Sequence, residues 1–202
     1  MADARRSLRA SLRAKRREIS AVDRARAARQ VAHHAERALN LRPGQRIGIY
    51  AATAEELDTS GLIALALRRG CHVYLPRIDR RLRVCAMRFV PLARGPLRRP
   101  LRRNRFGITE PEGAELASAR LLDVVFLPLV AFDRYGTRLG MGGGYYDRAF
   151  AFRRLRSVWH APLLVGVAYA LQEVERIAPA AHDVPLDRVI TERGVIRFAR
   201  DR

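Results

Sequence analysis

Residues 121–148 of the chain read LLDVVFLPLVAFDRYGTRLGMGGGYYDR, and they carry most of the information about its architecture. The stretch begins with a nearly continuous apolar run at 121–130, which is typical of a strand buried on both faces of a sheet. A glycine-rich loop comes directly after this strand, and residues 146–155 then show helical spacing. This order predicts a flexible loop at the carboxyl edge of a parallel sheet.

The glycine loop has the features of an anion site. Four glycines lie within residues 140–144, and glycine permits positive φ angles and close approach of the backbone to a ligand. Free amide groups at the start of the following helix favour an anion, so phosphate is the ligand that we predict. The loop lacks the lysine and hydroxyl residue of a Walker A loop, and its glycine spacing is wrong for a Rossmann fingerprint.

The rest of the chain alternates helical patterns with apolar runs, which predicts an α/β sheet covered on both faces. Ligands of such sheets bind beyond the carboxyl ends of the strands, where the loops after Tyr50 and Ala168 join the glycine loop. On the first helix, Leu8, Leu12 and Ile19 share one side and leave the neighbouring faces to Arg5, Arg6, Arg9 and Arg13. The elements that we expect are two helices in the first forty residues, separated near the N-cap residue Ser20; a strand at 46–50; a helix at 54–69; a strand at 71–75, halted by Pro76; an edge or antiparallel strand at 84–90; a strand at 163–168; and a hairpin of 189–191 with 195–198.

The composition predicts one globular domain over residues 1–202. Of the 202 residues 49% are hydrophobic, which is enough for a single buried core. No segment approaches the roughly 20 apolar residues of a membrane helix, and the arginine-rich start lacks the apolar block of a secretory signal. We therefore expect a monomeric, cytoplasmic protein with no membrane contact, in which Cys71 and Cys85 are free buried thiols.

The net charge of +19 raises the question of nucleic-acid binding. Lys15 is the only lysine, and the arginines are scattered among alanines through helices and loops alike, which fits a chain-wide compositional bias as well as a binding face. The densest run, at 97–105, contains Pro100 and is expected to be an exposed loop. Because no aromatic stacking platform accompanies the charge, nucleic acid is an unlikely partner.

Several carboxylates have two interpretations at this stage. Asp147 is either a first-turn carboxylate favoured by the helix dipole or a ligand of the Mg²⁺ that accompanies nucleotide phosphates. The acidic residues at 55–58 are either a helix start or part of the pocket, and the pair His182-Asp183 is equally ambiguous. The other histidines have no ligand spacing, so zinc is not expected.

The residues around the glycine loop resemble a known family. RLGMGGGYYDR at 138–148, preceded by LPLVAFD at 127–133 and by Gly136, looks like the signature region of the 5-formyltetrahydrofolate cyclo-ligases, also called methenyltetrahydrofolate synthetases. The resemblance covers essentially the whole chain. Further segments similar to the family are RRSLR at 5–9, RREIS at 16–20, residues 49–59, FGITEP at 106–111, Gln172, His182-Asp183 and ITE at 190–192.

The resemblance implies a fold and a reaction. The implied fold is a single-domain, three-layer αβα sandwich with a mostly parallel sheet, of the NagB/RpiA/CoA transferase-like kind. The implied reaction closes 5-formyltetrahydrofolate to 5,10-methenyltetrahydrofolate with ATP and Mg²⁺ and releases ADP and phosphate. It proceeds through a phosphorylated formyl group, an iminophosphate, and such phosphoryl transfer depends on positioning and charge stabilisation.

The resemblance also implies roles for individual residues. The opening helix would contact ATP through Arg5, Arg6, Ser7, Leu8 and Arg9. The glycine loop would bind ATP through Arg138, Leu139, Gly140, Met141, Gly142, Gly143, Gly144, Tyr145 and Tyr146.

The folate and metal positions follow in the same way. Folate would contact Arg9, Ala51, Glu56, Phe106, Met141, Gly142, Gly143, Gly144 and Tyr145. Asp147 and Asp183 would hold Mg²⁺.

The chain departs from the family at two places, with arginine where the family often has lysine in the opening helix and with Met141 and Gly143 in a loop that often carries a basic residue. Arginine keeps the charge but changes the geometry. Two other functions stay open on the sequence: a related ATP-using folate-pathway enzyme and, less favoured, an arginine-rich RNA-binding protein.

Overall fold

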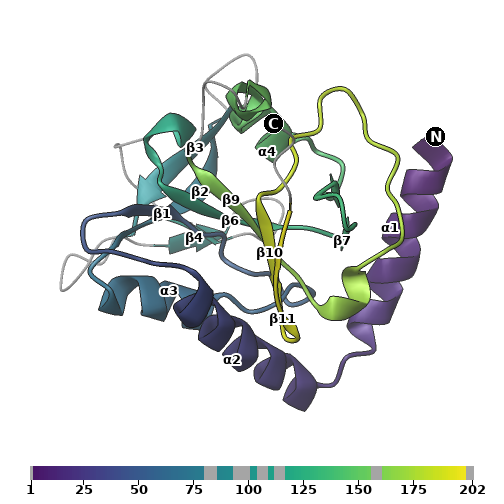
Figure 1. Cartoon of the computed structure of the whole chain (residues 1–202), viewed down its shortest axis with the longest axis horizontal. Coiled ribbons are helices and arrows are strands. Elements are labelled where there is room, and N and C mark those ends of the chain that lie inside the picture. Colours follow the sequence, from purple (N-terminus) through teal and green to yellow (C-terminus); the bar gives the residue numbers. More distant parts are fainter. Residues whose placement is uncertain are drawn as a thin grey trace.

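A seven-stranded, mostly parallel sheet forms the centre of the molecule, in the order β11-β10-β9-β6-β1-β2-β3 (Figure 1). The computed structural model describes residues 2–79, 86–92, 101–103, 109–111, 117–155 and 161–198. Within the sheet β2, β1, β6, β9 and β10 pair in parallel, while β3 and β11 are antiparallel edge strands. The bounds are β1 Arg46–Gly48, β2 His72–Asp79, β3 Ala86–Pro91, β6 Val124–Pro128, β9 Leu163–Val167, β10 Arg188–Thr191 and β11 Gly194–Arg197.

Helices cover both faces of this sheet. α2 (Ala21–Ala38) and α3 (Ser60–Arg68) lie on one face, and α4 (Tyr145–Ala149) lies on the other with the 3-10 turn η2 (Ala151–Arg154), as Figure 1 shows. A hydrophobic core lies on each face of the sheet, and alternate residues of β6 point into one or the other. Val124 and Phe126 pack with α2 and α3, whereas Val125 and Leu127 pack with α4. The predicted α/β fold with three layers and a mostly parallel sheet is confirmed.

The order of the strands reverses between β1 and β6. From β1 the chain proceeds to β2 and β3 on one side, and from β6 it proceeds to β9, β10 and β11 on the other. Loops at the carboxyl ends of two such neighbouring strands diverge and leave a crevice between them, where ligands of open α/β sheets bind. The topology therefore locates the candidate site beyond the carboxyl ends of β1 and β6.

Helix α1 (Ala2–Arg17) stands apart from the two helix layers, next to the segment around residue 180 (Figure 1). The predicted separation of α1 from α2 is confirmed, because the Ser20 hydroxyl accepts from the backbone N–H of Asp23 at 3.1 Å as an N-cap. Leu12 is buried beneath α1 and Leu8 packs beside it, but Ile19 lies beyond the end of the helix and packs in the core under α2.

The predicted helix at 54–69 is shorter and begins only at Ser60. The acidic residues before it form a turn: Glu56 Oε2 accepts from the Thr53 N–H at 2.9 Å, and Asp58 Oδ1 accepts from the Ser60 N–H at 2.9 Å. Side chains that bond to nearby backbone in this way favour turns over helix interiors. Of these acidic residues, Glu55 and Glu56 line the cavity described below, and Asp58 does not.

The predicted strand at 71–75 also differs, because β2 continues through Pro76 to Asp79. β2 pairs with β1 as far as Tyr74, and beyond that point β3 is its only partner among the described strands. Proline is tolerated where one edge of a strand is unpaired.

The glycine loop does not follow β6 directly. A hairpin of β7 (Ala131–Phe132) and β8 (Arg138–Leu139) intervenes, closed by buried Asp133, which accepts from the N–H groups of Tyr135 and Thr137. The helix expected at 146–155 is the five-residue α4 followed by η2. The hairpin moves the glycine loop away from the strand end and toward α1.

Other predictions are confirmed in part. β3 is an antiparallel edge strand, β9 is parallel, and β10 with β11 forms the expected hairpin; the 3-10 turns η1 (Ala119–Leu121) and η3 (Ala170–Gln172) complete the sheet connections. The arginine run at 97–105 is not entirely a loop, since β4 (Leu101–Arg103) pairs with β5 (Thr109–Pro111). The rest of that run, Phe106 and Cys85 lie outside the described residues. Cys71 is buried as expected, and its thiol donates to the Arg42 carbonyl at 3.3 Å. Among the described helices, none has the length and apolar character to cross a bilayer.

Candidate active site

A cavity of about 700 Å³ opens at the predicted edge of the sheet. The loop after β1 contributes Thr53, Ala54, Glu55 and Glu56, and the end of β6 contributes Pro128 and Leu129. Apolar side chains of β2 and β3 extend the wall with Pro76, Ile78 and Met87. The remaining lining residues are Arg5, Arg9, Arg13, Arg16, the segment 138–147, His182 and Asp183.

The glycine loop forms the wall nearest α1. Gly142 and Gly144 have φ angles of +100° and +61°, which L-amino acids with a side chain rarely adopt. The carbonyl of Gly140 accepts from Arg9 Nε at 2.8 Å, so the opening helix and the glycine loop are in direct contact. Met141 is exposed at the tip of the loop.

Four arginines of α1 face the cavity. Arg5, Arg9, Arg13 and Arg16 are spaced by four, four and three residues, which places them on one side of a helix. Arg5 and Arg9 were predicted site residues, whereas Arg13 and Arg16 were not. The spacing is the signal in the sequence from which Arg13 and Arg16 would have been recognised as site residues.

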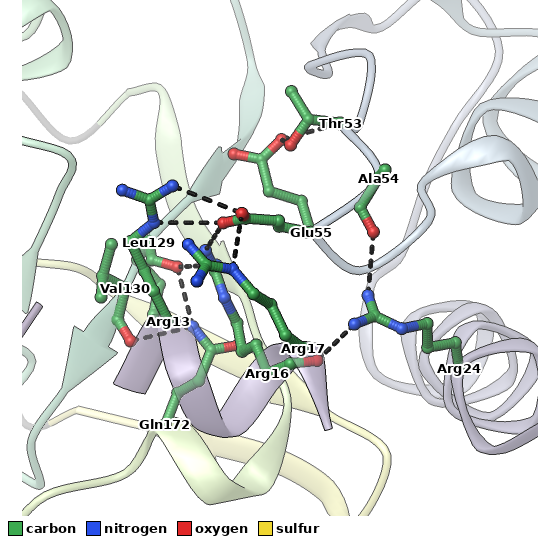
Figure 2. Close-up of polar contacts among 11 residues, drawn as sticks. Arg13, Arg16, Arg17, Arg24, Thr53, Ala54, Glu55, Leu129, Val130 and Gln172 are labelled. Atoms are coloured by element: carbon green, nitrogen blue, oxygen red, sulfur yellow. Dashed lines mark hydrogen bonds and ion pairs between the residues drawn. The ribbon is translucent and has the colours of Figure 1, made fainter. Parts of the chain in front are cut away.

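Glu55 connects α1 to the loop after β1. Figure 2 shows the side chains of Arg13, Arg16 and Arg17 converging on its carboxylate. Arg13 Nε lies 3.1 Å from Oε2, Arg17 Nε lies 3.0 Å from Oε1, and Arg16 Nη2 is more distant at 3.7 Å. The hydrogen bond from Arg13 contributes most to a lowered pKa of Glu55, so the carboxylate is charged at neutral pH.

Two further ion pairs line the cavity, and both involve an aspartate predicted to bind metal. Arg138 Nη2 donates to Asp147 Oδ1 at 2.6 Å, and Arg5 Nη2 donates to Asp183 Oδ2 at 2.5 Å. Burial tends to raise the pKa of Asp183, but the hydrogen bonds from Arg5 and from the Ala180 N–H outweigh it and lower the pKa. The Val184 N–H donates to Asp147 Oδ1 at 3.2 Å, which brings the tail segment to the glycine loop.

Two tyrosine hydroxyls near the site stay protonated. Burial, followed by the charge of Glu56, raises the pKa of both Tyr50 and Tyr146 far above the ordinary value. Tyr146 is one of the residues that line the cavity.

The donor set fits the groups that the sequence suggested. Five arginines and four carboxylates line the cavity, and the buried Arg138 Nε has no hydrogen-bond partner among the described residues, as expected where an anion is to bind. The described hydrogen bonds of Asp147 all use Oδ1 and those of Asp183 use Oδ2, while Asp183 Oδ1 lies 3.7 Å from His182 Nε2. The described residues contain no cluster of three or more metal-ligating side chains; Mg²⁺, however, needs only one or two carboxylates beside phosphate and water.

The structure brings most of the predicted site residues together. Arg5, Arg9, Glu56, residues 138–147 and Asp183 all line one cavity. Four predicted residues are not in the lining: Arg6 is exposed and pairs with Asp3, Ser7 is exposed, Leu8 packs under α1, and Ala51 lies just before the lining segment. Phe106 lies outside the described residues.

The loop after Ala168 contributes indirectly. Its Gln172 donates to the carbonyls of Leu129 and Val130 at 2.8 and 3.0 Å and so fixes the end of β6. None of its residues lines the cavity.

The comparisons with known proteins agree on one family. The model of the 5-formyltetrahydrofolate cyclo-ligase family matches residues 1–192. The 5-formyltetrahydrofolate cyclo-ligase of Haemophilus influenzae is 33% identical over 186 residues, which cover 90% of this chain and 94% of that protein.

Two solved structures have the same architecture. The 5,10-methenyltetrahydrofolate synthetase of Aquifex aeolicus has a TM-score of 0.79 at 29% identity and covers 98% of this chain and 94% of its own. The 5,10-methenyltetrahydrofolate synthetase of Mycoplasma pneumoniae has a TM-score of 0.70 at 19% identity, covers 93% of this chain and 98% of its own, and supports the fold.

Proposed function

Since the chain belongs to the 5-formyltetrahydrofolate cyclo-ligase family and is an enzyme, we propose that it converts 5-formyltetrahydrofolate to 5,10-methenyltetrahydrofolate at the cavity described above, using ATP and Mg²⁺. The observation that carries the proposal is the meeting of Arg9, Arg138 and the glycine loop at one wall of the cavity. Such an arrangement of cations and backbone suits the phosphates of a nucleotide.

The glycine loop is the proposed phosphate site. Its positive φ angles and small residues keep the backbone open to a ligand, and Arg138 supplies a buried charge with an unused Nε–H. Arg9, which donates to the Gly140 carbonyl, and Arg5 add positive charge from α1. Of the opening segment, the remaining residues Arg6, Ser7 and Leu8 act as part of the helix that carries these arginines.

Asp147 and Asp183 are the proposed ligands of Mg²⁺. When bound, the ion would neutralise phosphate charge and orient the γ-phosphoryl group for transfer. The aspartates are joined through the tail segment by the Val184 N–H, and each has an arginine partner that balances its charge.

The other end of the cavity suits the folate. Glu56 Oε2 accepts hydrogen bonds from the N–H and the hydroxyl of Thr53, and among the described residues the hydrogen bonds of Glu56 use Oε2 and not Oε1. A carboxylate held in this way is suited to the N–H groups of a pterin edge. Pro76, Ile78, Met87 and Pro128 offer apolar surface for the ring.

The chemistry requires activation of a poor leaving group. The formyl oxygen would attack the γ-phosphorus of ATP while the bond to the ADP oxygen breaks, and the N5 lone pair completes an iminophosphate. N10 would then attack the formyl carbon, the C–O bond would break with release of phosphate, and the N10 proton would go to solvent. The residues present position and stabilise charge, as phosphoryl transfer requires.

The test is a direct assay with single omissions. Purified protein with 5-formyltetrahydrofolate, ATP and Mg²⁺ should produce the near-ultraviolet absorbance of the methenyl product, with one ADP formed per product. Omission of ATP, or addition of a chelator, should abolish the signal. Absence of product at high enzyme concentration, or product without ADP, would refute the proposal.

A further inference from the structure

Arg16 is a buried cation on the cavity wall without a close partner. Only 3% of its side chain is exposed, and it lines the cavity at the loop after β1. Its Nη1 lies 3.4 Å from the Leu129 carbonyl, its Nη2 lies 3.7 Å from Glu55, and its Nε has no hydrogen-bond partner among the described residues. A guanidinium has five N–H donors, so most of its donors are unused.

The groups around Arg16 are engaged with better-placed donors. Gln172 donates to the Leu129 carbonyl at 2.8 Å, and Arg13 and Arg17 hold the two oxygens of Glu55 at 3.1 and 3.0 Å (Figure 2). A buried arginine elsewhere in the fold is treated differently, since Arg153, with 2% of its side chain exposed, has the Asp187 oxygens at 2.9 and 3.1 Å. Arg16 thus lacks the close carboxylate partner that Arg153 has.

A buried guanidinium without hydrogen-bond acceptors has an unfavourable desolvation free energy, and a ligand that supplies an acceptor removes this penalty. Burial lowers the pKa of Arg16 while Glu56 and Glu55 act to raise it, and arginine stays charged in proteins. The geometry therefore calls for an oxygen acceptor from a ligand.

The position of Arg16 separates it from the phosphate site. Arg9, which contacts the glycine loop, and Arg16 are seven residues apart on α1, or roughly 10 Å along the helix. Arg16 instead lines the same cavity as Glu56 of the loop after β1, next to Glu55, which lies 3.7 Å from its Nη2. A pterin edge presents a carbonyl acceptor beside N–H donors, which matches a guanidinium next to a carboxylate.

We propose that Arg16 is a folate-binding residue that donates to the carbonyl oxygen of the pterin ring, while Glu56 accepts from the adjacent N–H groups. The inference rests on the proposed function and adds a specificity-determining residue to it. It also implies that the ligand-free protein tolerates an unfavourable side chain for the sake of binding.

The experiment compares Arg16→Met with the matched control Arg17→Met. Arg17 binds the same Glu55 more closely, is 58% exposed and does not line the cavity. If Arg16 acted only by holding α1 through Glu55, the Arg17 variant would show at least as large an effect. Arg16→Lys, which keeps the charge but not the planar fork, is a second test variant.

We expect Arg16→Met to raise the KM for 5-formyltetrahydrofolate about 10- to 100-fold, with the KM for ATP within about twofold of wild type. The Tm without ligand should be unchanged or higher, because an uncompensated buried charge is removed. Arg16→Lys should also raise the folate KM, and Arg17→Met should leave both constants unchanged. Folate binding measured by calorimetry without ATP should weaken in parallel.

Equal folate affinity in wild type and both Arg16 variants would overturn the inference. A parallel rise of the KM values for folate and ATP, or a lowered Tm with unchanged folate affinity, would also overturn it.

A substrate analogue without the glutamate tail distinguishes the ring from the tail. The loss of affinity in Arg16→Met should persist with this analogue. Its disappearance would assign Arg16 to a tail carboxylate and overturn the proposal. A wild-type protein that neither binds nor converts the folate would instead refute the proposed function.

Discussion

Gly142 illustrates how a single residue links backbone geometry to ligand binding. Its φ of +100° is strained for any residue with a Cβ, yet a Cβ there would meet its nearest neighbour, Arg9, only at 3.8 Å. The position is therefore restricted by conformation and not by space. Glycine leaves the backbone free to face a phosphate without a side chain between them.

We predict that Gly142→Asp lowers turnover about 100-fold or more, whereas Gly142→Ala retains part of the turnover. Both variants carry the same backbone strain, of about 1–2 kcal/mol, but only aspartate adds a carboxylate beside the phosphate site. Steady-state kinetics with ATP titration and thermal melts of both variants check this. Wild-type turnover in the aspartate variant would mean that the loop has another role.

Among the elements, helix α1 is unusual because arginine contacts attach it to the rest of the molecule. Arg5 meets Asp183, Arg9 meets Gly140, and Arg13 and Arg17 meet Glu55. Its apolar contribution consists of buried Leu12 with Leu8 beside it. The stability of α1 should therefore depend on charge more than that of the helices packed on the sheet.

We predict that Glu55→Gln accelerates hydrogen exchange in α1 about fivefold at neutral pH, which corresponds to a loss of about 1 kcal/mol from partly exposed pairs. Glu36→Gln, which breaks the exposed pair with Arg69, is the matched control and should leave α1 unchanged. Equal protection of α1 in the Glu55 variant and the wild type would contradict the assigned role.

The same carboxylate gives a pH dependence of known sign. The pKa of Glu55 in the folded protein lies below its ordinary value of 4.5, so its stabilising effect is complete above that value and is lost as the pH falls through the folded pKa. As the pH falls through the folded pKa of Glu55, the protection of α1 against hydrogen exchange should decrease in the wild type. The Glu55→Gln variant should show no such decrease.

For the molecule as a whole, the net charge of +19 is the most conspicuous quantity. Several arginines donate to backbone carbonyls, as Arg24 does to Ala54 and Arg188 does to Ala38. Others line the cavity or form the pairs described above. Much of the charge thus takes part in contacts within the chain.

We predict only weak, salt-sensitive affinity for RNA, with a Kd no tighter than about 10⁻⁶ M at physiological ionic strength, as for non-specific electrostatic binding. Fluorescence anisotropy with a mixed-sequence single strand, at a series of salt concentrations, measures this. Tight binding that persists at high salt and is indifferent to ATP would favour the RNA-binding alternative.

Much of the fold and site was accessible from local pattern. The glycine loop with Asp147, the Ser20 cap between the first two helices and the apolar runs of β6 and β9 follow from propensity, capping and hydrophobic period. The element bounds were less accurate at residues 54–59 and at Pro76, because side-chain bonds in a turn and an unpaired strand edge depend on neighbours.

The chain's local pattern was sufficient for the α/β architecture and the glycine loop, because these depend on residue type and short spacing, and the family was indicated by resemblance. The assembly of the cavity required the folded chain: it joins Asp183 to Arg5, Glu55 to three arginines of α1, and Leu129 to both Arg16 and Gln172 across long separations. The incomplete pairing of Arg16 is likewise visible only in the tertiary structure. Whether a buried donor has an acceptor depends on every segment packed around it, and no property of the residue or its neighbours in the chain contains that answer.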